Sequence, residues 1–65
     1  MLEHEYDVFE TLPDGSVRWH VSVLGIQPAL AKLQGISKQT TNECFAIHID
    51  TKAIIGTVQA RSLAG

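Results

Sequence analysis

Cysteine, basic charge and long apolar runs are all scarce in this chain, and each shortage excludes a class of protein. Only one of the 65 residues is a cysteine, Cys44, so an internal disulfide is impossible and the repeated Cys ligands of a zinc finger are missing. No segment approaches the roughly 18 uninterrupted apolar residues of a membrane-spanning helix. The opening letters, MLEHEYD, are acidic and polar where a secretory signal is basic and then apolar. We therefore expect a cytoplasmic protein that makes no contact with a membrane.

Positive charge is also in short supply. Five Lys and Arg residues stand against seven Asp and Glu residues, which gives a net charge of −2. The basic residues are scattered, whereas Glu3, Glu5, Asp7 and Glu10 are all within the first ten positions. Because proteins bind DNA and RNA mainly through clustered Lys and Arg side chains, this distribution predicts no nucleic-acid partner.

The length predicts a single domain, residues 1–65, with an ordered core at about residues 6–59 and frayed ends at 1–5 and 60–65. A domain of this size buries only about 60% of the surface that its unfolded chain exposes, so its core leaves little margin. Small domains gain stability from disulfides, a bound metal or association with another chain. Because a single cysteine cannot form an internal disulfide, the composition favours association with another chain as the source of additional stability.

The segment YDVFETLPDGSVRWHVSVL predicts a β-hairpin. Pro13 suits the first turn position and Gly15 the left-handed position that follows, which makes residues 13–15 a three-residue loop. This loop pairs Phe9 with Trp19 on one face of the hairpin, and on the other face it pairs the acidic Glu10 with the basic Arg18. The predicted pairs are Thr11 with Val17, Glu10 with Arg18, Phe9 with Trp19, Val8 with His20 and Asp7 with Val21.

The pattern then changes period, and GIQPALAKLQGISKQTTN predicts one amphipathic helix. Pro28 is expected at the first helical position, and Gly35 lies inside the pattern at a cost of about 1 kcal/mol relative to Ala. The apolar positions at helical spacing are Ile26, Ala29, Leu30, Leu33 and Ile36.

Alternation returns in NECFAIHIDTKAIIGTVQA, which predicts a second hairpin. Residues 50–53 suit a four-residue connection built on a type I turn. The predicted pairs are Ile49 with Ile54, His48 with Ile55, Ile47 with Gly56, Ala46 with Thr57 and Phe45 with Val58.

These elements predict an α+β fold: a two-layer ββαββ domain whose mainly antiparallel four-stranded sheet has one helix packed on one face. The helix makes the third strand parallel to the second, and the strand order stays open. The side chains expected beneath the helix are Phe9, Val17, Trp19, Val21, Val23, Phe45, Ile47, Ile49, Ile54 and Val58. The helix-free face is expected to carry Tyr6, Val8, Glu10, Arg18, His20, Ser22, Cys44, Ala46, His48, Ile55, Thr57 and Gln59.

The segments YDVFETLPDGSVRWHVSV, ALAKL and NECFAIHIDTKAIIG, in this order, resemble small uncharacterised bacterial proteins with a strand–strand–helix–strand–strand plan. The resemblance spans Tyr6 to Gly56 and implies the fold but no activity, since its features are a turn, an amphipathic helix and alternating strands. The first half is also similar in layout to the antitoxins of small bacterial toxin systems. The glycine-bearing strand–loop motif and DNA-binding segment of those antitoxins are not found in the remaining sequence.

The helix-free face, partly apolar and left uncovered by this chain, is the candidate interaction surface. The last strand, AIIGTV, is apolar on both sides and would make a poor uncovered edge. These features predict a non-catalytic protein-interaction module that forms a homodimer through this face or the last strand, with another protein or an extended peptide as the other candidate partner. The residues predicted to form the surface are Tyr6, Val8, Arg18, His20, Ala46, His48, Ile55 and Thr57.

The alternative is a small metal-dependent factor or enzyme that uses His20, His48 and Cys44 at a subunit interface. Cys44 and His48 are four residues apart on one strand, which separates their Cα atoms by about 13 Å, too far to share one ion. A flat strand surface also offers neither oxyanion donors nor a cleft that excludes water. We therefore expect no catalytic residue, no metal ligand and no cofactor.

Overall fold

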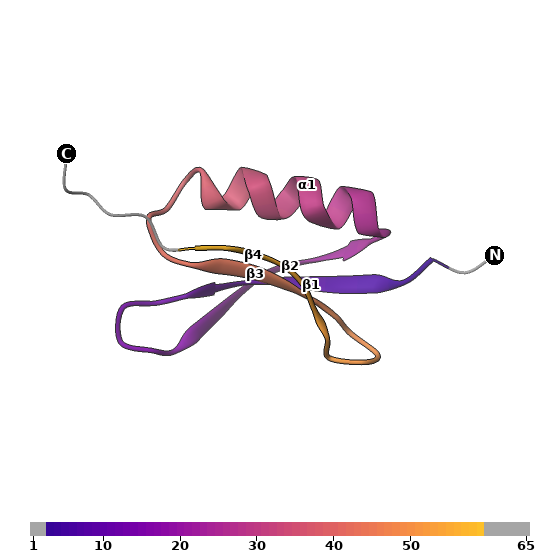
Figure 1. Ribbon diagram of the computed structural model, residues 1–65, viewed down its shortest axis with the longest axis horizontal. Coiled ribbons are helices and arrows are strands. Elements are labelled where there is room, and N and C mark those ends of the chain that lie inside the picture. Colours follow the sequence, from indigo (N-terminus) through magenta and orange to yellow (C-terminus); the bar gives the residue numbers. More distant parts are fainter. Residues whose placement is uncertain (1–2, 60–65) are drawn as a thin grey trace.

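The computed structural model describes residues 3–59 and has the predicted order of elements (Figure 1). The elements are β1 (Glu5–Thr11), β2 (Val17–Leu24), α1 (Ile26–Ser37), β3 (Cys44–His48) and β4 (Ile54–Val58). The predicted α+β fold, a ββαββ domain with one four-stranded sheet, is confirmed. Of the ends predicted to be frayed, residues 1–2 and 60–65 lie outside the described part of the chain. The helix of the described chain is neither long nor apolar enough to cross a membrane.

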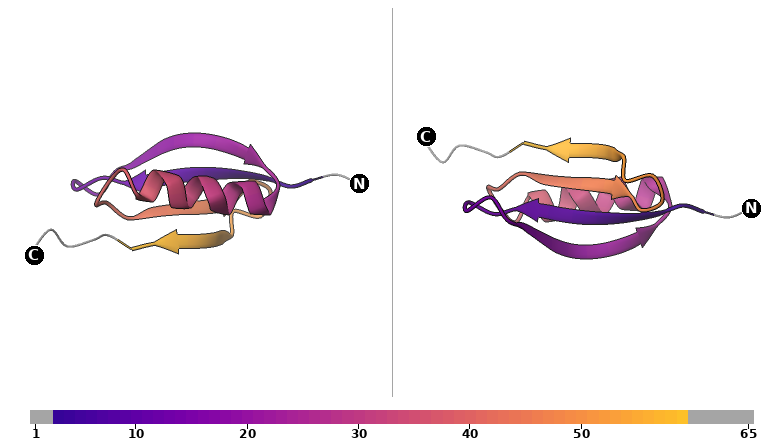
Figure 2. Two further views of the ribbon diagram at one scale, coloured as in Figure 1. Left: turned by 90° about the horizontal axis from the view of Figure 1, so that it is seen from above. Right: turned by 90° about the horizontal axis from the view of Figure 1, so that it is seen from below.

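The strand order, which the sequence left open, is β2-β1-β3-β4, and every neighbouring pair is antiparallel. Because β2 and β3 both run opposite to β1, they are parallel to each other, as predicted. Parallel strands need a long crossover connection, and α1 supplies it. The helix lies along one face of the sheet, above the central strands (Figures 1 and 2). No other element within residues 3–59 covers the second face.

The first hairpin has the predicted three-residue loop. The Leu12 N–H donates to the Ser16 carbonyl at 2.8 Å, and Gly15 has a φ of 92°, the left-handed conformation expected of it. The predicted pairing of Phe9 with Trp19 is also confirmed, as are the pairs Glu10 with Arg18 and Thr11 with Val17.

Beyond Phe9 the predicted register of the first hairpin is wrong, because His20 is an extra residue in β2. Val8 pairs with Val21, and Asp7 pairs with Ser22. An extra residue of this kind is a β-bulge, which shifts by one residue the alternation of the strand beyond it. As a result, Val21 and Val23 face the helix although Trp19 does not.

The second hairpin turns one residue earlier than predicted. The His48 N–H donates to the Ala53 carbonyl at 2.8 Å, so residues 49–52 form the loop, and Lys52 takes the left-handed conformation with a φ of 63°. The predicted register is therefore wrong. The observed pairs are Ile47 with Ile54, Ala46 with Gly56, Phe45 with Thr57 and Cys44 with Val58, with Ile55 as the extra residue.

Packing under the helix explains this register. A Cβ atom on Gly56 would lie 3.1 Å from Leu30 Cδ2 and 3.3 Å from Leu33 Cδ2, closer than side chains normally pack. The strand position beneath these leucines therefore favours a glycine, and the one-residue shift places Gly56 there.

The helix itself starts two residues before the predicted position. It begins at Ile26 after Gly25, whose φ is 94°, and it continues through Gly35 to Ser37. Pro28 is thus the third helical residue, where its missing N–H is still one of the groups that a helix start leaves unbonded. Ala29 and Leu33 are buried as predicted.

The helix covers the face that we predicted to be free. Val8, Cys44 and Ala46 are fully buried and pack against Leu33, so their placement on the helix-free face is wrong. Val21, Val23 and Val58 do pack against this core as predicted. By strand alternation, the helix-free face instead carries the residues Phe9, Val17, Trp19, Phe45, Ile47 and Ile54.

Candidate functional site

The helix-free face of the sheet presents large apolar side chains to solvent. Trp19 is 55% exposed and Ile54 is 62% exposed, although both are large apolar residues. Phe9 lies between Trp19 on β2 and Phe45 on β3, and the two phenylalanine rings stack with their centroids 5.4 Å apart. We refer below to the set Phe9, Val17, Trp19, Phe45, Ile47 and Ile54 as the aromatic face.

Acidic groups accompany the aromatic face. The Asp7 carboxylate accepts hydrogen bonds from the Trp19 indole N–H, at 3.2 Å, and from the Ser22 hydroxyl. Glu5 shares the alternation of Asp7 along β1, and Glu43 accepts a hydrogen bond of 3.4 Å from the Thr11 hydroxyl. These carboxylates give the face a negative charge, and Asp7 orients the indole ring of Trp19.

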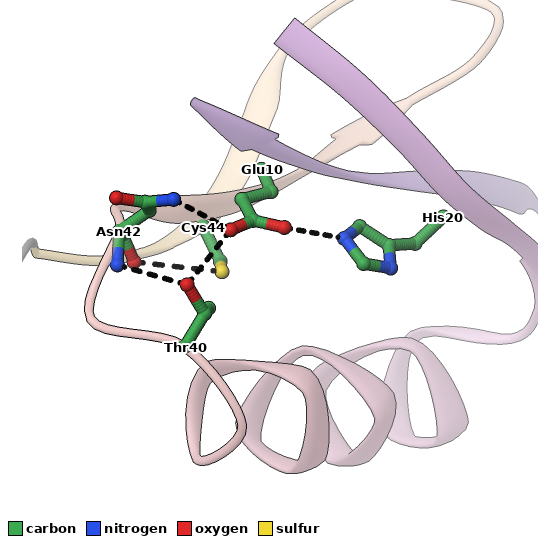
Figure 3. A network of polar contacts seen from close by, with 5 residues as sticks. All are labelled: Glu10, His20, Thr40, Asn42 and Cys44. Atoms are coloured by element: carbon green, nitrogen blue, oxygen red, sulfur yellow. Dashed lines mark hydrogen bonds and ion pairs between the residues drawn. The ribbon is translucent and has the colours of Figure 1, made fainter. Parts of the chain in front are cut away.

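The opposite face holds a buried carboxylate whose oxygens are both hydrogen-bonded (Figure 3). Glu10 is only 7% exposed, and its Oε1 lies 2.9 Å from Nε2 of His20. Its Oε2 accepts hydrogen bonds from the Thr40 hydroxyl at 2.7 Å and the Asn42 amide at 2.8 Å. The donors come from β2 and from the segment between α1 and β3, so the network joins this segment to the sheet.

These hydrogen bonds stabilise the ionised form of Glu10. The bond from His20 has the largest effect, followed by those from Thr40 and Asn42, and together they lower the pKa of Glu10 from 4.5 to about 2. The Cys44 thiol, which is buried beside them, donates to the Asn42 carbonyl at 3.7 Å. The network was not predicted from the sequence, because residues 40–42 come to lie against β1 only through the crossover connection.

A groove of about 420 Å³ lies between β2 and α1, beside this network. His20 is one of the residues that line it, and one of its ring nitrogens is held by Glu10. A carboxylate that orients an imidazole is a common part of catalytic sites, in which the imidazole activates the thiol or hydroxyl of a nearby Cys, Ser or Thr. The described side chains that line the groove include neither; they are His20, Val21, Lys32, Gly35, Ile36 and Gln39.

Most of the predicted interaction surface lies on the covered side. Tyr6, Val8 and Ala46 are buried, so they are not available to a partner, and this part of the prediction is wrong. His20 and Ile55 are half-buried on the same side, as the two extra residues of the bulges. Arg18 and Thr57 are exposed, and Thr57 pairs with Phe45 on the helix-free side; His48 is half-buried at the end of β3.

The alternative set His20, His48 and Cys44 does not form one site within the described chain. Cys44 is next to Glu10 in the sheet, near His20, but it is completely buried. His48 pairs with Tyr6, four residues along β1 from Glu10, or about 13 Å away.

His48 has different neighbours, which the sequence did not point to. Its ring lies 4.6 Å from the ring of His4, centroid to centroid, and 5.3 Å from that of Tyr6. One ligand-type atom from each of His4, His48 and Asp50 lies within 4.8 Å of the others. The only signal in the sequence is the His-x-Asp spacing of residues 48 and 50. His4 joins them because β1 is the neighbour of β3.

Comparisons of the chain with models of protein families, with curated proteins and with solved structures found no significant match.

Proposed function

We propose that this protein is a non-catalytic interaction module that associates with a second copy of itself through the aromatic face. The observation that carries the proposal is the exposure of Trp19, Val17 and Ile54, each more than half accessible to water, around a stacked pair of phenylalanines. Large apolar side chains gathered on one face mark interaction surfaces in soluble proteins.

The size of this face is suitable for a dimer. A typical stable interface takes about 800 Å² from each partner. That is about 18% of the 4494 Å² accessible surface of this protein, a share that one broad face of a two-layer domain can supply. Two such sheets would pack face to face about 10 Å apart, as in β-sandwiches. The thin core that a domain of this length can build would then become thicker.

The charge of the face favours a protein partner over a phosphate-bearing one. Glu5, Asp7 and Glu43 repel nucleic acids and anionic lipid surfaces, although exposed aromatic rings on a sheet could otherwise stack on bases. Burial of Asp7 in a dimer is less costly than burial of a free carboxylate, because Trp19 and Ser22 already donate hydrogen bonds to it.

Sedimentation velocity from micromolar to millimolar concentration tests the proposal. We expect the wild-type chain to reach the mass of a dimer, and we expect the Ile54→Lys and Trp19→Lys variants to remain monomers, since each places a charge within the proposed interface. Ile26→Lys is the matched control: Ile26 is 46% exposed but lies on α1. A wild-type chain that stays monomeric throughout, or a control that dissociates like the other two, would contradict the proposal.

A further inference from the structure

At one end of the sheet, the start of β1 lies beside the turn between β3 and β4, and three potential metal ligands meet there. His4 comes from the residue before β1, and His48 and Asp50 come from the end of β3 and the turn. One ligand atom from each lies within 4.8 Å of the other two. We propose that His4, His48 and Asp50 bind a divalent transition-metal ion, with Zn²⁺ as the best match.

The distances suit a tetrahedral ion after a small movement. Zn²⁺ takes nitrogen and oxygen ligands at about 2.0–2.2 Å, which places the ligand atoms roughly 3.3 Å from one another. The longest separation in the cluster, which is at most 4.8 Å, therefore has to shorten by no more than roughly 1.5 Å. His4 and Asp50 are exposed, so rotation of their side chains can close this gap, whereas His48 is half-buried and remains in place.

The backbone holds the bases of the three side chains in position. The carbonyl of His4 accepts a hydrogen bond of 2.8 Å from the Gly25 N–H, at the start of α1. The Ile49 N–H donates to the Glu5 carbonyl at 3.0 Å, and the Lys52 N–H donates to the His48 carbonyl at 2.7 Å. These bonds join the first strand to the turn, so the ligands are brought together before any ion binds.

The ring of His48 has partners that orient it toward the cluster. Tyr6 packs on the ring at an interplanar angle of 66°, and the Thr51 hydroxyl lies 3.0 Å from Nδ1. With Nδ1 occupied by Thr51, Nε2 is the nitrogen that can bind a metal. A neutral imidazole that binds through Nε2 carries its proton on Nδ1, and the Thr51 hydroxyl is placed to accept it. Metal binding would exchange the present bond from the Thr51 backbone N–H to Nδ1, which is 3.2 Å long, for this contact.

The kind of ligand selects the kind of ion. Two imidazoles and one carboxylate suit Zn²⁺ and its neighbours in the transition series, whereas Ca²⁺ and Mg²⁺ prefer shells made of oxygen. Three protein ligands leave a fourth position for water or for a group from another molecule. Because the folded chain brings residue 4 close to residues 48–50, the ion would bind the folded state preferentially and stabilise it, in a protein with one cysteine.

The test is a calorimetric titration of ZnCl₂ into the full chain, produced without a histidine tag, together with thermal unfolding with and without the ion. We expect one Zn²⁺ per chain and a higher unfolding temperature when it is bound. With Co²⁺ in place of Zn²⁺, visible absorption bands of tetrahedral cobalt should appear. Each of the variants His4→Ala, His48→Ala and Asp50→Asn should weaken binding at least tenfold.

The third histidine provides the matched control. His20→Ala removes an imidazole that lies outside the cluster, and it should change the affinity less than twofold. If His48→Ala fails to fold because its contact with Tyr6 is lost, the exposed residues His4 and Asp50 still decide the question. No binding of Zn²⁺ below millimolar concentration, or binding that Asp50→Asn and His4→Ala leave unchanged, overturns the proposal; so does an equal loss in His20→Ala.

Thr51 tests the orientation of His48 separately, as a positioning residue. Thr51→Val removes the hydroxyl acceptor and should weaken Zn²⁺ binding about tenfold, the lower end of the range for lost partners of metal ligands. Thr51→Ser keeps the hydroxyl and should restore binding to near the wild-type affinity. A general defect in the turn would instead affect both variants alike, and that result would remove Thr51 from the proposal.

Discussion

The two faces of the sheet differ in the size of their side chains, and the difference runs against the usual expectation. The face under α1 is lined mostly by small or medium residues such as Ala46, Cys44 and Val8, together with Gly56, although Tyr6 near the start of β1 is also buried on this face. The helix-free face carries Phe9, Phe45 and the only tryptophan. A helix can approach a sheet closely where the side chains are small, so the larger residues are left for a surface that another molecule can cover.

The faces also differ in how completely an acidic side chain is hydrogen-bonded. Glu10, on the covered face, has donors on both oxygens and its pKa is lowered to about 2. Asp7, on the helix-free face, has donors at Oδ1. A completely bonded carboxylate can be buried permanently, whereas one with capacity for further bonds suits a surface that is covered only on association.

The largest difference between the faces should appear in the free energy of unfolding. Leu33→Ala, which leaves a cavity in the covered core, should lower it by about 2–5 kcal/mol. Ile54→Ala removes an exposed side chain and should change it by less than about 0.5 kcal/mol. Urea denaturation of both variants, at a concentration where the chain is monomeric, checks this comparison. Equal losses would mean that the faces contribute equally to the fold of one chain.

A single methyl group at the contact between sheet and helix should have the next largest effect. Gly56→Ala puts a Cβ against Leu30 and Leu33 and should destabilise the fold by about 1–3 kcal/mol. Gly35→Ala is the control, because a Cβ there meets no atom within 4 Å and α1 gains a better helix former, worth up to about 1 kcal/mol. Thermal unfolding should therefore move in opposite directions in the two variants.

The buried carboxylate predicts a dependence on pH. The folded pKa of Glu10, about 2, is below its ordinary value of 4.5, so the stability that the ionised group contributes is fully present above about pH 4.5 and is lost as the pH falls toward 2. Glu10→Gln should lower the free energy of unfolding at pH 7 by about 1–3 kcal/mol, because its amide faces groups that also donate. The difference in free energy of unfolding between this variant and the wild type should become smaller as the pH falls from 4.5 to 2.

The control for this prediction is Glu5→Gln, an exposed residue of the same strand. Its unfolding curve should follow that of the wild type throughout the acid range. If the stability of the Glu10→Gln variant depends on pH in the same way as that of the wild type, then the hydrogen-bond network does not stabilise the ionised form of Glu10.

The smallest expected effect concerns charge on the helix-free face. Asp7→Asn keeps an acceptor for the Trp19 indole but removes a negative charge from each half of the proposed dimer. Like charges across an interface repel by about 1 kcal/mol in water at 4 Å, so association should become stronger by tenfold or less. Sedimentation measures this change. Weaker association would show that the Asp7 carboxylate makes a favourable contact across the interface and would contradict this prediction.

Local patterns in the sequence were sufficient for much of the fold. Pro13 and Gly15 specify the first turn, and the pairing of Phe9 with Trp19 follows from it over a few residues. The change from alternation to helical spacing located α1 to within two residues of its start. These features depend on neighbours in the chain, whose conformational preferences act regardless of the rest of the molecule.

The choice of face was not available from the same patterns. β1 and β3 have apolar residues on both sides, and the larger phenylalanines indicated the wrong side. The side that is covered was decided by how closely the helix can approach the sheet, and not by the size of the side chains. The bulges at His20 and Ile55 add to this, since each shifts the alternation of its strand. Neither a histidine nor an isoleucine in a strand indicates from the sequence that a bulge occurs there.

The order of elements, the first turn and the amphipathic helix were therefore determined by the sequence alone, because each is a local property of consecutive residues. Only the tertiary structure decided which face the helix covers and that β1 lies between β2 and β3. That strand order places His4 beside His48 and residues 40–42 beside Glu10. The physical reason is that these contacts join residues 30 or more positions apart, and their energies depend on how closely two packed layers can approach.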